Sequence, residues 1–488
     1  MLYSKPFIVS FDYNKNQKML KKIIYYINKN KIGTVSINGL VDIKTLSKIK
    51  ADFISVDIDY FALNYNNFRK IKPFNRKVKQ IRIIVDSPII DFNILENIAR
   101  AINKQFKKSL IFVFKFWDNN LDLNRLNTLI KISKKYNFIP NFLFLNIKNS
   151  NQLKTICQSF LPYKHDIENN KIFIDSPLIL YSLTKKKYYC PSQRLMFHIN
   201  DQGYMMDCQF GGRIYGNILS HSIEELWKAK LKQQNTHRSG HFECAANSSN
   251  IAPYELLASI YNKITKQKSV LYNEYKEYIR DHFNRDIQIL DAACGTGTLI
   301  KKLSSFTKNI DGLENSHKMA EIARQKTGKK IYTHSFVNFN LNKKYDLILS
   351  TFDSVNYILN KEDLARVFKS FLSHLRNNGS IIFDINTLNK FKNHYNDIIK
   401  LKINNYIVFF RSSYKRPFWR LKIEFIKNEK YFIETHFERF YSQNQIKEVL
   451  KDVGFRQIKI LNNLTNNTKD NGRVFVIAKK LTNNDNFF

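Results

Sequence analysis

Hydrophobic and polar positions in the second half of the chain alternate between short apolar runs and longer segments with apolar residues at helical spacing. The apolar runs predict buried strands, and the longer segments predict helices. Strands and helices that alternate across short turns indicate a largely parallel, doubly wound α/β sheet with helices on both faces. The expected strands are 289–293, 309–314, 345–351 and 381–385, and the expected helices are 317–326 and 361–376.

The first half alternates in the same way up to about residue 180, and this predicts an open or partial βα barrel. We expect three parts: the barrel over 1–180, a small Cys-containing extension over 181–249, and the α/β domain over 250–488. A β-rich insertion at about 388–445 is expected to form three antiparallel strands that cover a substrate mouth; a plain β-cover or a dimer surface is the alternative. The strands expected before residue 180 are 6–10, 33–37, 53–57, 80–85, 110–114 and 142–145.

Composition narrows the classes of protein. The 488 residues exceed one domain, and 43% hydrophobic residues can fill substantial cores. No apolar run reaches membrane-spanning length, so we expect a cytoplasmic protein without a membrane partner. Five cysteines at irregular spacing argue against a disulfide framework. The net charge of +38 is compatible with RNA binding, but Lys is scattered among Asn and Ile throughout the chain, which favours a general composition bias.

A glycine turn follows the strand at 289–293, in the sequence ILDAACGTGTL over residues 289–299. Gly295 and Gly297 remove side chains where the backbone approaches a ligand closely. The turn lacks the Lys-Ser/Thr of a phosphate-binding loop and the third glycine of a dinucleotide site, so the expected ligand is an adenosine compound without phosphates. Glu314 ends the next strand, about where an acid binds ribose hydroxyls in nucleotide-binding sheets.

This half resembles the class I S-adenosylmethionine-dependent methyltransferases, on the glycine motif and on YDLI (345–348), FDSVNY (352–357), GSIIFDINT (379–387), DVGF (452–455) and RVFVIAK (473–479). The resemblance implies S-adenosylmethionine as cofactor. It also implies that Asp291 orients the glycine loop or reaches the methionine amino group. The family's adenine-contacting acid is replaced by Ser335; the neighbouring Phe336 is expected to pack on adenine, with ordinary core packing as the alternative.

The resemblance also places acceptor residues. The loop after the strand at 345–351 borders the transferred methyl group in the family, so Phe352 is assigned to the cofactor side, and Asp353 and Asn356 to the pocket. Tyr261 lies where the family places a helical lid and is a substrate-binding candidate. In-line transfer needs a general base only for a protonated acceptor, and Asp353 and His436 are the candidate bases, with structural roles as the alternative.

The first half resembles a truncated radical S-adenosylmethionine enzyme with its SPASM or twitch extension. The similarity lies in SINGL (36–40), in the Cys-rich segment 190–208, and in GNILSHSIEELW (216–227). The resemblance implies an auxiliary iron–sulfur cluster on Cys190, Cys208 and Cys244, with a fourth ligand from Cys157 or His241; three inert thiols are the alternative. The CxxxCxxC triad of the radical-generating cluster is missing, so we expect a binding module rather than radical chemistry.

The sequence therefore predicts a methyltransferase that acts on a small molecule or peptide, with a degenerate N-terminal module that binds a substrate, a peptide leader or a radical S-adenosylmethionine partner protein. Two alternatives stay open. An RNA methyltransferase would use the positive charge, and a non-catalytic cofactor- or partner-binding protein would have lost chemistry in both halves.

Overall fold

The computed structural model describes residues 6, 8–13, 16–62, 78–86, 90, 92–105, 109–117, 123–145, 150–175, 177–184, 195–234, 249–265, 269–393, 397–465 and 472–481. The chain forms two compact units. Unit 1 contains 1–251 and 424–433, and unit 2 contains 252–423 and 434–488. The expected division at residue 180 stays a prediction. In the described part of the chain, no helix is long and apolar enough to cross a membrane.

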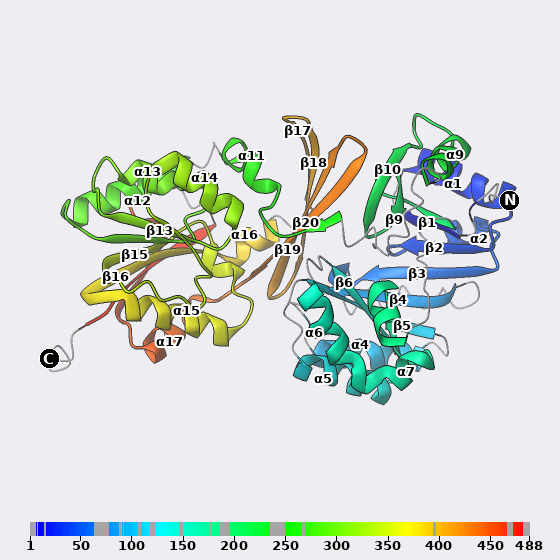
Figure 1. The fold of residues 1–488 in the computed structure, drawn as a ribbon, viewed down its shortest axis with the longest axis horizontal. Coiled ribbons are helices and arrows are strands. Elements are labelled where there is room, and N and C mark those ends of the chain that lie inside the picture. The colour runs from blue at the N-terminus through cyan, green and yellow to red at the C-terminus, as the bar shows by residue number, and fades with distance from the viewer. Residues whose placement is uncertain are drawn as a thin grey trace. The chain divides into compact units, whose positions relative to one another are not determined.

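Unit 1 is built on parallel strands that pair in chain order, from β1 to β7 (Figure 1). The strands are β1 (Ile8–Asp12), β2 (Thr34–Asn38), β3 (Phe53–Asp59), β4 (Val78–Asp86), β5 (Ser109–Trp117), β6 (Ile139–Leu145) and β7 (Phe173–Ile174). The helices are α1 (Gln17–Lys29), α2 (Ile43–Lys48), α4 (Phe92–Gln105), α5 (Leu123–Lys135), α6 (Ser150–Phe160), α7 (Lys164–Glu168) and α8 (Pro177–Thr184). The βα alternation expected from the sequence is present, whereas closure of these strands into a partial barrel stays a prediction.

The two faces of this sheet differ in polarity because successive side chains of a strand point to opposite faces. The face of Val9, Phe11, Val35 and Ile37 is apolar and buried. The other face carries polar residues in register across four adjacent strands, namely Asp12, Asn38, Asp57 and Arg82. From β1 to β4 the sheet therefore has one apolar face and one face with a row of polar residues.

The Cys-containing extension of unit 1 consists of β8 (Met196–Ile199), β9 (Tyr204–Cys208), β10 (Gly211–Asn217) and α9 (Ile223–Gln234). Cys208 packs against the apolar cluster of Ile111, Val113, Leu143 and Leu145. Cys190, Cys244 and His241 lie outside the described residues. Among those that are described, no group of three His, Cys, Asp or Glu side chains could hold a metal ion. The iron–sulfur cluster and the radical S-adenosylmethionine resemblance stay predictions.

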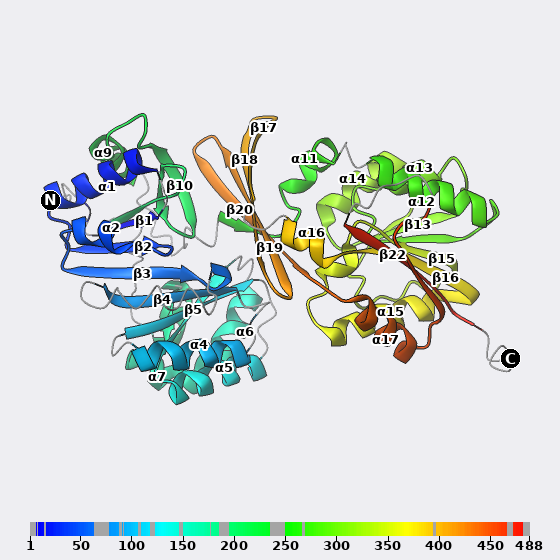
Figure 2. The same ribbon diagram turned by 180° about the vertical axis from the view of Figure 1, so that it is seen from behind.

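Unit 2 contains a seven-stranded sheet in the order β14-β13-β12-β15-β16-β22-β21, flanked by helices on both faces (Figures 1 and 2). All neighbouring strands are parallel except at β22, which is antiparallel to β16 and β21. This confirms the predicted α/β sheet. The strands are β12 (Ile289–Ala292), β13 (Ile310–Glu314), β14 (Ile331–Thr333), β15 (Tyr345–Ser350), β16 (Leu375–Asn386), β21 (Arg456–Leu461) and β22 (Arg473–Lys479), and the helices are α11 (Leu257–Ile264), α12 (Ser269–His282), α13 (Thr298–Leu303), α14 (His317–Thr327), α15 (Lys361–His374) and α17 (Gln443–Val453).

The insertion after β16 contains a short helix and four strands rather than three. The additional strand is β17 (Ile398–Ile403), which pairs antiparallel with β18 (Tyr406–Lys415). In β17, Ile and Leu alternate with Lys, and the side chains are exposed or half-buried. The hydrophobic pattern of this strand is therefore weaker than that of the neighbouring strands. The remaining elements are α16 (Leu388–Asn393), β19 (Phe418–Lys427) and β20 (Lys430–Arg439).

A buried ion cluster joins β16 to β22 and to the loop after β15. Asp384 is fully buried and accepts hydrogen bonds from the Tyr275 hydroxyl (2.7 Å) and from the backbone amides of Phe352 (2.8 Å) and Asp353 (2.9 Å). Arg473 forms ion pairs with Asp384 and, at 2.6 Å, with the Asp353 carboxylate. The nearby negative charges raise the pKa of Arg473 against the opposing effect of burial, so the guanidinium stays charged.

Replacing Arg473 with Met should destabilise the protein by about 3–5 kcal/mol, because the fully buried Asp384 and the half-buried Asp353 lose their counter-charge. Arg376→Met is the control: its ion pair with Asp346 is largely exposed and its loss should cost at most about 1 kcal/mol. Urea unfolding of the full chain measures both variants. Equal, small shifts of the unfolding midpoint would show that the buried cluster stabilises the protein no more than an exposed ion pair does.

Candidate functional site

The glycine loop between β12 and α13 combines an open position with a tightly packed one. Ala293, Gly295 and Gly297 all have left-handed backbone conformations, with φ of 65°, 55° and 72°. A Cβ atom at Gly297 would lie 2.9 Å from Cγ2 of Thr327, whereas a Cβ at Gly295 would meet nothing within 4 Å. Gly297 therefore allows the loop to pack on α14, and Gly295 leaves space in front of the loop.

Glu314 lies at the end of β13, directly beside this loop. Its two carboxylate oxygens accept hydrogen bonds from the backbone amides of Gly295 and Ser316, both at 2.8 Å. Burial raises the pKa of Glu314, and these backbone donors oppose that effect. Each carboxylate oxygen has a second lone pair, so the fixed group can still accept hydroxyl hydrogen bonds.

Asp291 presents an unpaired carboxylate in the same place. The residue is fully buried, and within the described residues neither of its oxygens has a hydrogen-bond partner. Burial, followed by the negative charge of Glu314, raises the pKa of Asp291 to about 7. An unpaired buried carboxylate is costly, and a bound cation would remove that cost. Both carboxylates are hydrogen-bond acceptors. Asp291 therefore fits the cationic amino group of S-adenosylmethionine, and Glu314 fits its ribose hydroxyls.

Helix α11 is fastened to the glycine loop by Asn262. The Thr296 hydroxyl donates to Asn262 Oδ1 (2.7 Å), and the Lys326 ammonium donates to Asn262 Oδ1, Thr296 and Thr298, each at 3.0 Å. The expected lid helix thus contacts the loop, and Tyr261 extends from it into a cavity.

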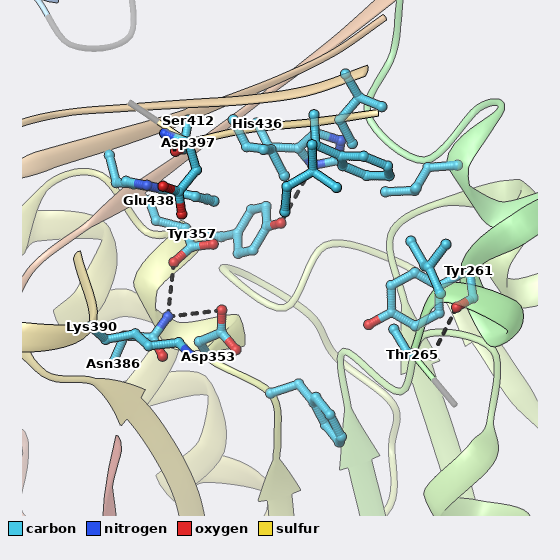
Figure 3. A pocket seen from close by; sticks show the side chains of 18 of the residues that line it. Tyr261, Thr265, Asp353, Tyr357, Asn386, Lys390, Asp397, Ser412, His436 and Glu438 are labelled. Carbon is cyan, nitrogen blue, oxygen red and sulfur yellow. Dashed lines mark hydrogen bonds between the residues drawn. The ribbon is translucent and has the colours of Figure 1, made fainter. Parts of the chain in front are cut away.

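This cavity of about 400 Å³ lies within unit 2 (Figure 3). Of the residues predicted from the sequence, the structure brings together Tyr261, Phe352, Asp353 and His436 on its lining. Tyr261 is the neighbour of Asn262, which binds Thr296 of the glycine loop, so the cavity adjoins that loop. Aromatic and aliphatic side chains from the insertion form much of the remaining lining, including Phe391, Ile399, Leu401, Phe410, Trp419 and Leu421.

One end of the cavity is polar. The side-chain amide of Asn386 donates to the carboxylates of Asp353 (3.0 Å) and Glu438 (3.2 Å), as Figure 3 shows. Among the described groups, neither Asn386 Oδ1 nor Trp419 Nε1 has a hydrogen-bond partner, although both atoms are buried. Two lining residues therefore each keep one unsatisfied polar atom, an acceptor on Asn386 and a donor on Trp419.

The two candidate bases differ in their surroundings. Asp353 is held by Arg473 and by Asn386, so both of its oxygens are engaged. His436 is 1% exposed; its Nδ1 lies 3.4 Å from the Tyr357 hydroxyl and its Nε2 lies 3.3 Å from a Glu434 oxygen. His436 thus has the orienting carboxylate that a general base requires, and Asp353 has a structural role in the ion cluster.

Two sequence candidates lie away from the lining. Asn356 is fully buried; its amide donates to the Arg439 carbonyl (2.7 Å) and its oxygen accepts from the Asn386 backbone amide (2.9 Å), so it positions a lining residue. Phe336 is half-buried and lies near Phe371, with the ring centroids 6.4 Å apart. Their direct binding roles stay predictions.

Sequence reasoning named His436 on β20 but missed Glu434 and Glu438. These two residues and His436 stand at every second position of the strand, so they share one face, and all three are at least nine-tenths buried. Three buried ionisable residues at alternate positions of one strand are a signal of function that was readable in the sequence as their spacing.

Comparisons with known proteins cover the same unit. Residues 289–379 match the family described as "Methyltransferase domain". A putative methyltransferase of Geobacillus is 26% identical over 249 residues, which span 46% of this chain and 99% of the relative. A dTDP-3-amino-3,6-dideoxy-alpha-D-glucopyranose N,N-dimethyltransferase of Streptomyces fradiae is 23% identical over 26% of this chain and 52% of its own. The crystal structure of an S-adenosylmethionine-dependent methyltransferase from Clostridium acetobutylicum has 27% identity and a TM-score of 0.42, over 47% of this chain and 99% of that one.

The chain therefore carries an S-adenosylmethionine-dependent methyltransferase domain, as the sequence predicted. The family match begins at β12 and includes Asp291, Gly295, Gly297 and Glu314.

Asp291→Asn should weaken S-adenosylmethionine binding roughly 30-fold or more at pH 8, because a buried charge pair is lost. For the parent, affinity should rise roughly tenfold from pH 6 to pH 8, since a carboxyl with a pKa of about 7 ionises over this range and only its charged form attracts a cation. The variant should lose this dependence. Calorimetry measures both, with exposed Asp286→Asn as the control. An affinity of the parent that is constant with pH would contradict the assignment.

Proposed function

We propose that this protein transfers a methyl group from S-adenosylmethionine to an amine of a small molecule bound in the cavity of unit 2. The observation that carries the proposal is the unpaired, buried carboxylate of Asp291 beside a glycine loop with open space in front of it. When bound, S-adenosylmethionine supplies a methyl group that is already activated by a positively charged sulfur. The protein's task is then to bind, orient and desolvate the two partners.

The cofactor-side residues divide this task. Asp291 would hold the cationic amino group, and Glu314 would accept the ribose hydroxyls. Gly295 leaves the space that the backbone needs for close approach to the ligand. Phe352 packs against Tyr272, with the ring centroids 4.4 Å apart, and forms a wall between this region and the cavity.

The lining supports an amine acceptor with an apolar or ring-shaped body. Aromatic side chains such as Phe391, Phe410 and Trp419 can stack on the body. The Glu438 carboxylate lies at one end of the lining beside Asn386, and it favours a group that carries N–H donors or a positive charge. A relative from Streptomyces fradiae is named for N,N-dimethylation of an amino sugar, which supports the same class of acceptor.

RNA is the second candidate acceptor from the sequence, and the positive net charge is its support. The cavity lining combines the carboxylates of Asp353, Asp397 and Glu438 with the cations Lys390 and Arg473, so it offers no excess of positive charge to a phosphate backbone. The small-molecule acceptor is therefore the one we propose.

The proposal is tested with the purified full chain and methyl-labelled S-adenosylmethionine. Amino sugars and aromatic amines are compared with analogues in which a hydroxyl replaces the amine, and product is detected by mass spectrometry. Label transfer to amines but not to the matched alcohols is expected. Transfer to RNA alone would overturn the acceptor class, and no cofactor binding by the folded protein would overturn the proposed function.

Trp419→Phe should raise the KM for the acceptor about 2–10-fold, because the ring is kept while one hydrogen-bond donor, worth about 0.5–1.5 kcal/mol, is removed. The dissociation constant of S-adenosylmethionine should be unchanged, since Trp419 lines the acceptor cavity. Steady-state kinetics and calorimetry measure the two quantities. A change in the affinity for S-adenosylmethionine with an unchanged KM for the acceptor would show that Trp419 acts on cofactor binding instead.

A further inference from the structure

We propose that Tyr254, Tyr357, His436 and Glu434 form a proton relay that removes the proton lost by the acceptor during methyl transfer. This inference rests on the proposed function and adds to it the route of the proton. An amine must lose a proton before or after its nitrogen attacks, so a nearby base is useful for this acceptor class.

Glu434 is the fixed end of the relay. It is fully buried in β20 and accepts hydrogen bonds from the backbone amides of Tyr254 (2.9 Å), Leu256 (2.5 Å) and Leu257 (2.9 Å). Hydrogen bonds to the charged form of a carboxylate stabilise that form. A buried negative charge is therefore held next to His436 and fastened to the segment that leads into α11.

His436 lies between this carboxylate and a phenol. Its Nε2 is 3.3 Å from Glu434 Oε2, and its Nδ1 is 3.4 Å from the Tyr357 hydroxyl. A carboxylate can only accept, so the imidazole proton belongs on Nε2, and the lone pair of Nδ1 faces Tyr357. The ring of Tyr254 packs edge-on against the imidazole at 4.8 Å. A second proton, on Nδ1, would make His436 an imidazolium that forms an ion pair with Glu434.

The two tyrosines connect His436 to the cavity. The Tyr254 hydroxyl donates to the Tyr357 hydroxyl at 2.8 Å, and both residues line the cavity together with His436. Burial raises the pKa of both phenols well above the usual value of tyrosine. They therefore stay protonated, and they are suited to passing a proton on rather than to storing a negative charge.

Methyl transfer releases one proton from the acceptor nitrogen, and the relay carries this proton to His436. The acceptor nitrogen forms its bond to the methyl carbon as the methyl–sulfur bond breaks, with that electron pair left on sulfur. The nitrogen's proton goes to Tyr254 Oη, the Tyr254 proton goes to Tyr357 Oη, and the Tyr357 proton goes to His436 Nδ1. The products are the methylated amine, a neutral thioether and an imidazolium paired with Glu434.

Asp353 is less suited to this role although it lines the same cavity. Arg473 and Asn386 engage its two oxygens, and its backbone amide is tied to Asp384. Protonation of Asp353 would leave the buried guanidinium of Arg473 with one counter-charge fewer. His436 gains a favourable ion pair on protonation instead.

Tyr357→Phe and Tyr254→Phe test the route because they remove only a hydroxyl. Each should lower kcat about 100-fold or more near pH 7, with the affinity for S-adenosylmethionine unchanged. Because the acceptor then loses its proton to solvent, kcat of the variants should rise with pH and approach that of the parent under alkaline conditions. Tyr278→Phe, whose ring stacks on His282 on α12, is the control and should retain full activity. Parent-like kcat and pH profiles in both relay variants would overturn the proposal.

A second measurement does not depend on activity. Nitrogen-15 NMR of histidine-labelled protein, with the signal assigned by its loss in His436→Gln, reports which ring nitrogen of His436 carries the proton. The relay requires a neutral ring with the proton on Nε2, and Glu434→Gln should change that signal whereas Tyr278→Phe should not. A proton on Nδ1 of the neutral ring would overturn the relay.

The two proposals fail in different ways. If the parent transfers no methyl group to any amine although it binds S-adenosylmethionine, the proposed acceptor class fails, and the NMR measurement still decides the geometry of the relay. If the parent is active and the relay variants keep its rate at all pH values, methyl transfer stands and the relay is wrong.

Discussion

The ion cluster around Asp384 is the constraint on which the acceptor side of this site depends. This carboxylate binds Arg473 from β22, the Tyr275 hydroxyl from α12, and the amides of Phe352 and Asp353. The last two residues have φ of 57° and 55°, an unfavourable conformation for side chains other than glycine. The hydrogen bonds to Asp384 offset that strain, and the loop consequently holds Phe352 and Asp353 against the cavity.

The region around the glycine loop differs from the ion cluster, because one of its buried carboxylates has no hydrogen-bond partner within the described residues. Asp291 and Glu314 are both buried close to the glycine loop, and their mutual repulsion adds to the cost of burial. Glu314 is compensated by two backbone amides, while Asp291 is left for a ligand. An electrostatic cost retained in the free protein in this way becomes binding free energy when a cation arrives.

The sequence predicted the α/β sheet of unit 2 and the glycine loop because both are local patterns: apolar runs, helical spacing and a glycine turn. It did not predict the polar end of the cavity. Asn386 is 33 residues from Asp353 and 52 residues from Glu438 along the chain. These side chains meet only because the fold places the ends of β16 and β20 together. Asn356 was assigned to the acceptor because of its place in a motif. In the structure its side-chain amide binds backbone groups of Arg439 and Asn386, and its direct binding role stays a prediction.

The insertion after β16 supplies much of the cavity lining, whereas the sheet supplies the glycine loop. Asp291 and Glu314, which we propose to bind the cofactor, lie on β12 and β13, whereas the apolar lining and the His436–Glu434 pair come largely from elements between β16 and α17. Changes in the insertion can therefore alter acceptor and proton route without disturbing Asp291 or Glu314. Glu434 limits this freedom, because its three backbone hydrogen bonds reach the segment before α11, and α11 is fastened to the glycine loop through Asn262. A change at Glu434 would thus disturb both His436, the base that we propose, and the attachment of α11 to the glycine loop.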